Sequence, residues 1–276
     1  MIRAFANPHR FMALSRWLAP ACLGVGALLI VWSAWQGLWI VPQDDYQGGD
    51  IMRAMFIHVP SAWLAMASYM GLAVTSLVWF VWRHELADMA AKSIAPLGAA
   101  CPAMCLATGS IWGKPTWGTW WLWDDARMMS VLVMFFLFLG YMALRAAMET
   151  RQKAARAGAI LAMVGAVNVP LIKFSVDIWS SIHQDASVLR LDGPAMPPVY
   201  LTPLLIGGLG HMIFFLDFLL SGFHSMSKFI TDECSVHCID NLFFGAPFSR
   251  LRCRFVSTEQ IALEGVASVS TMLTFH

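Results

Sequence analysis

Six long apolar stretches limit what this 276-residue chain can fold into. They lie at about residues 18–40, 54–82, 93–111, 128–144, 157–176 and 201–224. A helix needs about 20 apolar residues to cross a bilayer, where every backbone polar group has to be paired within the segment. We therefore expect an all-α polytopic membrane protein with six transmembrane helices, formed by residues 1–224 as one domain.

The scarcity of charged residues supports a membrane protein. Charged residues make up 13% of the chain, against about 25% in soluble domains, and 58% of the residues are hydrophobic. The formal net charge is only +1 and no basic block is present, so we expect no nucleic-acid partner. Residues 225–276 form a polar tail without a predicted span, and the composition of this tail is compatible with disorder.

The distribution of lysine and arginine predicts the orientation of the helices. The flanks 1–17, 83–92 and 145–156 hold nine of these residues, whereas the flanks 41–53, 112–127 and 173–200 hold five. Because positively charged loops tend to stay on the cytoplasmic side, we expect both termini and the tail there. Residues 112–127, between the third and fourth helices, then lie at the outer face.

This outer segment, WGKPTWGTWWLWDDAR, is rich in tryptophan. It holds five of the chain's 13 tryptophans, namely Trp112, Trp117, Trp120, Trp121 and Trp123. Glycine and proline interrupt them, so we expect a loop or a short interfacial segment. Tryptophans also gather at membrane interfaces without any ligand. Five tryptophans so close together exceed such a belt, and they favour a platform for a flat, apolar ligand.

Two histidines are expected at the same face. His58 lies at the start of the second span, and His183 lies in the loop before the sixth. A single histidine in such a place is usually a hydrogen-bonded structural group. Two neutral imidazoles beside an aromatic platform could instead take both axial positions of an iron porphyrin. Lys114, Arg127 or Arg53 could bind its propionates, although interfacial snorkelling explains each cation taken alone.

Three blocks of the sequence resemble a known family. FIHVPSAW at 56–63, WGKPTWGTWWLWD at 112–124 and NVPLIKFSVDIWSSIHQ at 168–184 resemble the haem exporter protein C family of cytochrome c maturation. The resemblance covers about residues 40–190. It implies that haem b is held non-covalently at the periplasmic side of the bacterial inner membrane, with His58 and His183 as the axial ligands of the iron.

The same resemblance implies the remaining site residues and the partners. The five tryptophans would contact the macrocycle, with the following aspartate and Arg127 beside it. Haem would be presented to a periplasmic haem chaperone, and the chain would associate with a small membrane subunit and with the ATPase and permease subunits of an ABC-type complex. The chain has neither an ATPase motif nor the haem-attachment motif C-x-x-C-H. We therefore expect non-covalent haem transfer and no enzymatic activity.

Two questions stay open on the sequence alone. The family pattern has one aspartate after the last tryptophan, whereas this chain has Asp124 and Asp125, and either could hold that position. The chain could also be a haem lyase of the same tryptophan-rich superfamily, a b-type electron-transfer cytochrome or a haem permease. The lyases are larger and have further spans, a b-type cytochrome would favour ligands buried on facing helices, and no transmembrane path is evident.

Overall fold

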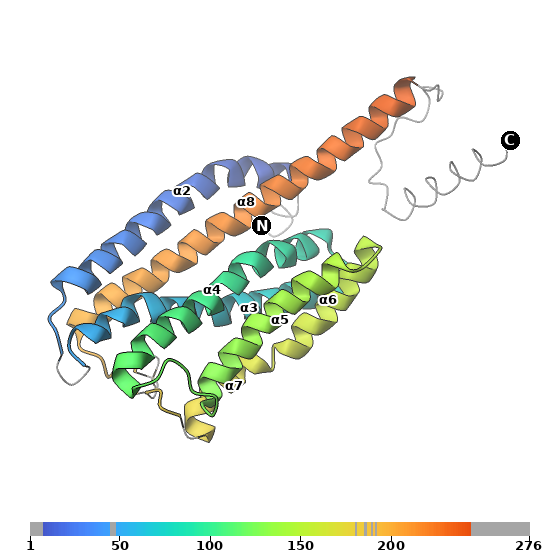
Figure 1. The fold of residues 1–276 in the computed structure, drawn as a ribbon. Helices are drawn as coiled ribbons and strands as arrows, with labels where there is room; N and C mark the ends of the chain where they lie inside the picture. The colour runs from blue at the N-terminus through green and yellow to red at the C-terminus, as the bar shows by residue number, and fades with distance from the viewer. Residues whose placement is uncertain are drawn as a thin grey trace. The chain divides into compact units, whose positions relative to one another are not determined.

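The computed structural model describes the backbone at residues 8–44, 48–179, 181–184, 187–188, 190 and 192–243, and side chains at 13–222 with the same internal gaps. The named elements in these ranges are all helices (Figure 1). Six helical segments are long and apolar enough to cross a membrane: Ala13–Ile40, Asp50–Trp82, Glu85–Trp117, Ala126–Ala146, Arg151–Ile178 and Pro198–Gly222. The prediction of an all-α fold with six spans is confirmed.

The connections between the elements differ in length, and the longest is formed by residues 179–197. In chain order they are α2 (Pro8–Trp35) with the π-turn η1 (Gln36–Ile40), η3 (Asp50–Ala54), α3 (Met55–Trp82), α4 (Glu85–Trp117), α5 (Ala126–Ala146), α6 (Arg151–Gly165), α7 (Asn168–Ile178) and α8 (Pro198–Phe243). The chain divides into two compact units, residues 1–227 and 228–276, and the six spans belong to the first.

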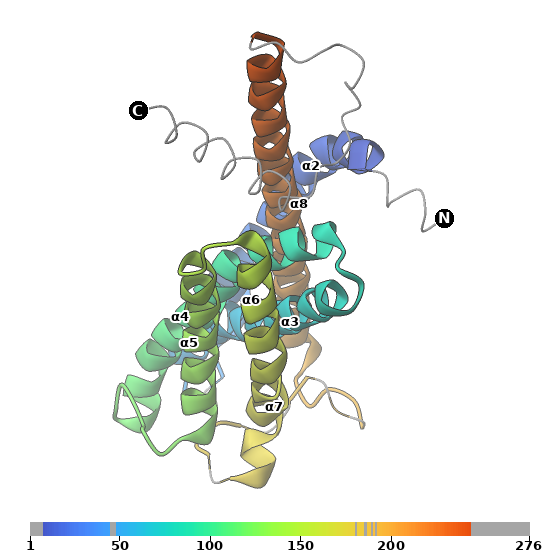
Figure 2. The ribbon, with the colours of Figure 1, turned by 90° about the vertical axis from the view of Figure 1, so that its right-hand side faces the viewer.

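Two helices differ from the predicted spans. The predicted fifth span is made of α6 and α7, which Figure 2 shows one after the other with a break between them. Pro170 lies in the first turn of α7, where its missing N–H is tolerated, and Asn168 Nδ2 donates to Ser130 O of α5 at 2.8 Å. The sixth helix continues past residue 224 to Phe243, because neither proline nor glycine occurs in residues 223–244 to end it. The expected disorder of the tail stays a prediction.

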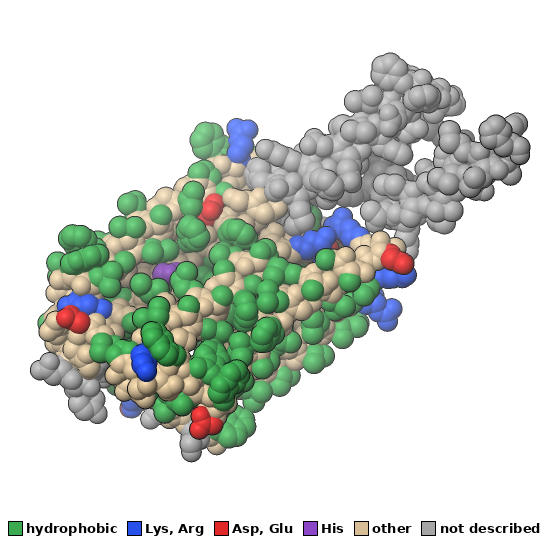
Figure 3. Space-filling model, in the orientation of Figure 1, with side chains coloured by type: hydrophobic (Ala, Val, Ile, Leu, Met, Phe, Trp, Pro, Cys, Tyr) green, Lys and Arg blue, Asp and Glu red, His purple; other side chains and the backbone are tan. Residues whose placement is uncertain are grey.

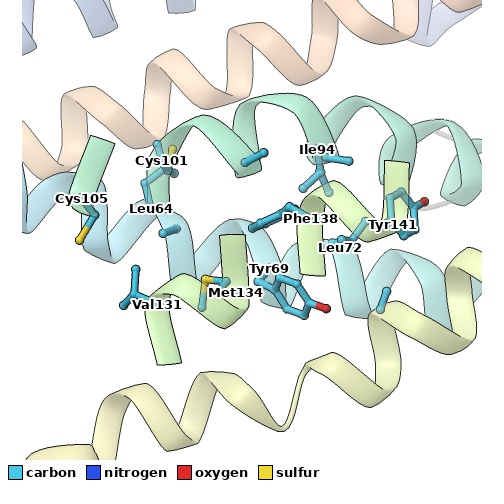
Figure 4. Packing of buried hydrophobic residues seen from close by; sticks show 14 of the residues in the cluster. Leu64, Tyr69, Leu72, Ile94, Cys101, Cys105, Val131, Met134, Phe138 and Tyr141 are labelled. Atoms are coloured by element: carbon cyan, nitrogen blue, oxygen red, sulfur yellow. The ribbon is translucent and has the colours of Figure 1, made fainter. Parts of the chain in front are cut away.

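The main core lies between α3, α4, α5, α6 and α7 (Figure 4). The Tyr69 ring of α3 meets the Phe138 ring of α5 edge to face, with 4.9 Å between their centroids. A Cβ added at Gly98 of α4 would lie 2.5 Å from the Phe138 ring, so this ring fits only against a glycine. Small residues of this kind allow close helix packing inside a membrane, where apolar burial does not drive association.

Helices α2 and α8 approach each other closely along a line of small residues. A Cβ at Gly26 would lie 2.8 Å from Phe214 N, and a Cβ at Gly210 would lie 2.9 Å from Leu29 Cβ. Beside this contact, the buried Ser33 hydroxyl donates to Pro203 O at 2.7 Å. A hydrophobic cluster that includes Met52, Phe56 and Leu204 joins this part of the molecule to the start of α3. On the face shown in Figure 3, apolar side chains cover the middle of the helices and most charged groups lie towards the ends.

Candidate functional site

The tryptophan segment is only partly a loop. Helix α4 continues through Trp112 and ends at Trp117, so the prediction of a loop was wrong for the first half of the segment. Pro115 lies in the last turn, where it removes the hydrogen bond of one carbonyl without ending the helix. The end comes at Gly118, whose φ of 78° needs a glycine and whose N–H donates to Lys114 O at 3.0 Å.

His58 lies in the first turn of α3 and is enclosed by α4. Its Nδ1 is 3.1 Å from Thr108 Oγ1, and the Thr108 hydroxyl hydrogen is donated to Met104 O at 2.7 Å. Because a hydroxyl has one hydrogen, Thr108 Oγ1 accepts from His58 Nδ1–H, and Nε2 keeps its lone pair at 3.8 Å from Cys105 Sγ. The imidazole meets the Trp112 ring edge to face, with centroids 5.8 Å apart. The ring also packs against Gly109, where an added Cβ would lie 3.0 Å from His58 Cε1.

His183 lies in the loop after α7, and its side chain is 18% exposed. Its Nδ1 is 3.2 and 3.3 Å from the two carboxylate oxygens of Asp125. Since an ionised carboxylate only accepts hydrogen bonds, it holds the proton on Nδ1 and leaves Nε2 as the free nitrogen. The ring lies against Trp117, with centroids 5.3 Å apart.

The pKa of the His183 imidazole is lowered. Burial is the main cause and favours the neutral ring, and the positive charge of Arg127 acts in the same direction. The Asp125 carboxylate opposes both effects, because its negative charge and its hydrogen bond favour the protonated ring. The net result is a neutral imidazole near pH 7, which is the form that binds a metal.

Asp125 holds three parts of the site together. The carboxylate is 2% exposed, caps the start of α5 by accepting from Met128 N–H at 2.8 Å, and accepts from Ser181 Oγ–H at 2.6 Å and Ile182 N–H at 3.2 Å. Burial raises the pKa of this carboxyl group, but the hydrogen bonds from Ser181 and Met128 and the nearby His183 outweigh burial, so the pKa is lowered overall. The neighbouring Asp124 is exposed. Of the two aspartates that the sequence left open, Asp125 is the one that contacts His183.

The tryptophans divide into two groups. Trp112 and Trp117, on the last turns of α4, each lie against one of the two histidines. Trp120 and Trp123 follow in the loop with 57% and 73% of their surface exposed, and the Trp121 ring meets the Trp123 ring at 5.7 Å. The indole Nε1 of Trp121 is buried and has no hydrogen-bond partner among the described residues. A buried donor without a partner is uncommon and fits a ligand acceptor at this position.

Of the three cations considered for propionates, Arg127 is the one whose charge acts on the pKa of His183. Its Nε donates to Ser175 Oγ at 3.2 Å and its Nη1 donates to Gln184 O at 3.3 Å, which places the guanidinium beside the loop that carries His183. Lys114 Nζ donates to Gly118 O at the end of α4. The Arg53 side chain is 17% exposed and donates to Asp50 and to Gly37 O.

Sequence reasoning missed the two groups that orient the histidines. Only one feature of the sequence could have pointed to Thr108: it lies four residues before Trp112, which puts both side chains on the same face of a helix. Ser181 stands two residues before His183, and nothing in the sequence shows that it contacts Asp125, which lies 56 residues away along the chain.

The sequence is similar to those of known proteins. A family model described as "Heme exporter protein C" matches residues 1–233. The haem exporter protein C of Bradyrhizobium diazoefficiens is 46% identical over 210 residues, covering 76% of this chain and 79% of that protein. The protein of the same name from Escherichia coli strain K12 is 38% identical over 197 residues, covering 71% and 79%. The chain belongs to the haem exporter protein C family.

The haem exporter protein C family also has a plant relative. A mitochondrial protein of Marchantia polymorpha that is named for cytochrome c biosynthesis is 35% identical over 182 residues, covering 66% of this chain and 76% of that protein. Membership makes this chain a multi-span membrane protein of haem export and cytochrome c biogenesis, associated with the cytochrome c maturation machinery. It is a haem-handling protein rather than a catalytic enzyme.

The residues at the end of α4 fit haem better than a bare metal ion. Among the described side chains, no group of three or more His, Cys, Asp or Glu residues could hold a metal ion. Two imidazoles are enough for a porphyrin iron, because the macrocycle supplies the other four nitrogen ligands. The site offers two Nε2 lone pairs, that of His58 at 3.8 Å from Cys105 Sγ, with an aromatic ring next to each histidine and a guanidinium nearby, and these groups fit a haem.

Proposed function

We propose that this chain holds haem b non-covalently between His58 and His183 and presents it to a periplasmic haem chaperone for cytochrome c biogenesis. One observation carries the proposal. Both imidazoles have Nδ1 engaged by a neighbour, Thr108 for His58 and Asp125 for His183, and each ring lies against a tryptophan of the α4 end. In a metal-binding histidine, a hydrogen bond at the ring nitrogen that does not bind the metal sets the tautomer and the orientation of the ring.

The proposed roles follow from the chemistry of each group. His58 and His183 would hold the haem iron through Nε2, and Asp125 is a positioning residue that acts through His183. The tryptophan rings give broad apolar contacts to the faces of the macrocycle. Arg127 lies where a propionate could receive a charge-assisted hydrogen bond, and the unpaired Trp121 Nε1 is a second donor. Imidazole ligation is reversible, so haem held in this way can be passed to a partner.

The geometry favours this function over the alternatives. A b-type cytochrome would favour both ligands buried on facing helices, whereas His183 lies in a loop with part of its side chain exposed. A haem lyase of the same superfamily would have further spans, and the described residues contain six.

We further propose that the site lies at the periplasmic face of the bacterial inner membrane. The lysine and arginine distribution supports this orientation, because the flanks at the opposite ends of the spans are richer in these residues. The partners in that setting are the haem chaperone, a small membrane subunit and the ATPase and permease subunits of an ABC-type complex.

The test uses the full chain purified with its haem, together with His58→Ala, His183→Ala and His211→Ala. His211 is a matched control, since its Nδ1 bonds within its own helix to Gly207 O at 2.7 Å. We expect both site variants to lose the low-spin spectrum and most of the haem, and to stop loading the purified chaperone, while His211→Ala keeps all three properties. Wild-type haem content and spectrum in both site variants would refute the ligand assignment. Normal ligation without transfer to the chaperone would refute the delivery function.

A further inference from the structure

A basic hollow lies between α4, α5 and α6, at the opposite end of these helices from the tryptophan segment. It has a volume of about 430 Å³ and is lined by Lys92 in the second turn of α4, Arg145 in the last turn of α5 and Arg151 at the start of α6. Apart from Tyr141, the rest of the lining is alanine, proline and methionine. Figure 3 shows basic side chains gathered where α4 begins and α5 ends. The hollow therefore combines three cations with an apolar wall.

The nearby acids do not satisfy these cations. Asp88 is buried behind the hollow, where one oxygen accepts from Arg145 Nη1 at 2.6 Å and the other is 3.7 and 3.8 Å from Arg151 Nε and Lys92 Nζ. The longer distances exceed a hydrogen bond. Glu85 pairs with Arg151 Nη2 at 3.0 Å from an exposed position. Neither acid lines the hollow, and two carboxylates face three cations.

Two donors in this cluster lack an acceptor. Arg145 Nη2 and Arg151 Nε are buried and have no hydrogen-bond partner within the part of the chain that the structure describes. The Arg145 side chain is only 8% exposed, so its guanidinium does not reach out to water as a snorkelling arginine would. A buried guanidinium donor left unpaired carries a free-energy penalty. The three cations therefore carry one more charge than the two carboxylates neutralise.

We propose that this hollow binds the phosphate of an anionic membrane lipid, with the start of its acyl chain along the apolar wall. Guanidinium and ammonium groups bind phosphate oxygens by charge-assisted hydrogen bonds. Basic pockets between transmembrane helices at the cytoplasmic end are typical sites for anionic headgroups. An apolar wall suits an amphiphile and offers nothing to a free phosphate ion. The lipid would join α4, α5 and α6 at the end of the molecule away from the haem site.

The experiment compares anionic lipid, neutral lipid and inorganic phosphate on the full-length protein in an uncharged detergent. The unfolding temperature is followed by tryptophan fluorescence, and bound lipid is counted by native mass spectrometry. We expect phosphatidylglycerol at saturating concentration to raise Tm by about 5 °C and to remain bound in the gas phase. Phosphatidylcholine and inorganic phosphate should do neither. Stabilisation by inorganic phosphate equal to that by phosphatidylglycerol would refute a lipid ligand.

Single substitutions test whether the lipid binds in this hollow. Lys92→Gln and Arg151→Gln each remove one lining cation and leave the buried pair of Arg145 and Asp88 intact. Lys153→Gln is the matched control, because Lys153 lies two residues after Arg151 but is 66% exposed, pairs with Glu149 and does not line the hollow. We expect phosphatidylglycerol binding to fall about tenfold in the two lining variants and to stay unchanged in the control. Equal binding by all three variants would overturn the proposal, and lipid counts on the folded fraction decide this even where a variant is less stable.

Discussion

His58 and His183 both have Nδ1 engaged by a neighbour, which leaves Nε2 as the candidate ligand atom, but the two rings are held by different means. His58 stands on a helix, packs against Gly109 of a second helix, and is oriented by a neutral hydroxyl. His183 stands in a loop and is oriented by a buried carboxylate that also caps α5. Since a carboxylate partner raises the basicity of an imidazole more than a hydroxyl does, the two proposed ligands should differ in strength. One proposed ligand is placed by helix packing and the other by electrostatics.

The largest loss of stability and haem affinity is expected when the carboxylate that contacts His183 is removed. In Asp125→Ala the cap of α5 is lost and the Ser181 hydroxyl and two backbone N–H groups lose their acceptor. We expect the free energy of unfolding to fall by about 1–3 kcal/mol and haem affinity to fall about 10–100-fold. Haem titration and thermal unfolding of the purified protein measure both quantities.

The neighbouring aspartate is the control for this change. Asp124 is exposed, so Asp124→Ala should alter stability by no more than about 0.5 kcal/mol and leave haem affinity unchanged. Equal losses of haem in the two variants would mean that Asp125 has no special role in orienting His183.

A smaller effect is expected on the His58 side. Thr108→Val keeps the shape of the side chain but removes the oxygen that accepts from His58 Nδ1–H. We expect haem affinity to fall about tenfold and the free energy of unfolding to fall by about 1 kcal/mol, because α4 keeps its packing but His58 Nδ1–H loses its acceptor. The control is Thr116→Val, since the exposed Thr116 hydroxyl also bonds to a carbonyl four residues earlier but contacts neither histidine. A loss of haem as large as that of Asp125→Ala would remove the proposed difference between the two ligands.

The smallest effect should come from the packing behind His58. In Gly109→Ala the new methyl group would lie 3.0 Å from His58 Cε1, so the ring has to shift by a few tenths of an ångström. We expect about a fivefold loss of haem affinity, from an imidazole displaced off its preferred rotamer. Gly24→Ala, where an added Cβ has no neighbour within 4 Å, should keep full affinity. Haem titrations that give the same affinity for both variants would show that helix packing does not place His58.

The positions of the six spans could be predicted from the sequence, because they depend on hydropathy alone. Apolar runs of about 20 residues gave the six spans, and the order of the spans put His58, His183 and the tryptophans at one end of the helices. The break between α6 and α7 was not predicted, because the sequence does not show whether Pro170 lies inside one long helix or in the first turn of a second helix. The helical half of the tryptophan segment was missed because Gly113 and Pro115 suggested a loop.

Details at the site could not be read from the sequence. A one-residue difference decides whether Asp124 or Asp125 is buried, and hydropathy does not distinguish two adjacent carboxylates. The buried residue is the one whose backbone precedes α5, where it can cap the helix. Thr108 reaches His58 only because α3 and α4 pack closely, and such contacts between helices leave no local pattern. Iron ligation by the two histidines, and their periplasmic location, stay predictions.

The most direct test of paired ligation uses cavity variants and added imidazole. His58→Gly and His183→Gly are each purified with haem, and absorption and electron paramagnetic resonance spectra are recorded before and after imidazole is added. We predict that each variant loses the low-spin signal and that imidazole restores it, because the small molecule can occupy the space of the missing side chain. A low-spin signal that persists in either variant without imidazole would contradict the claim that both histidines bind the iron.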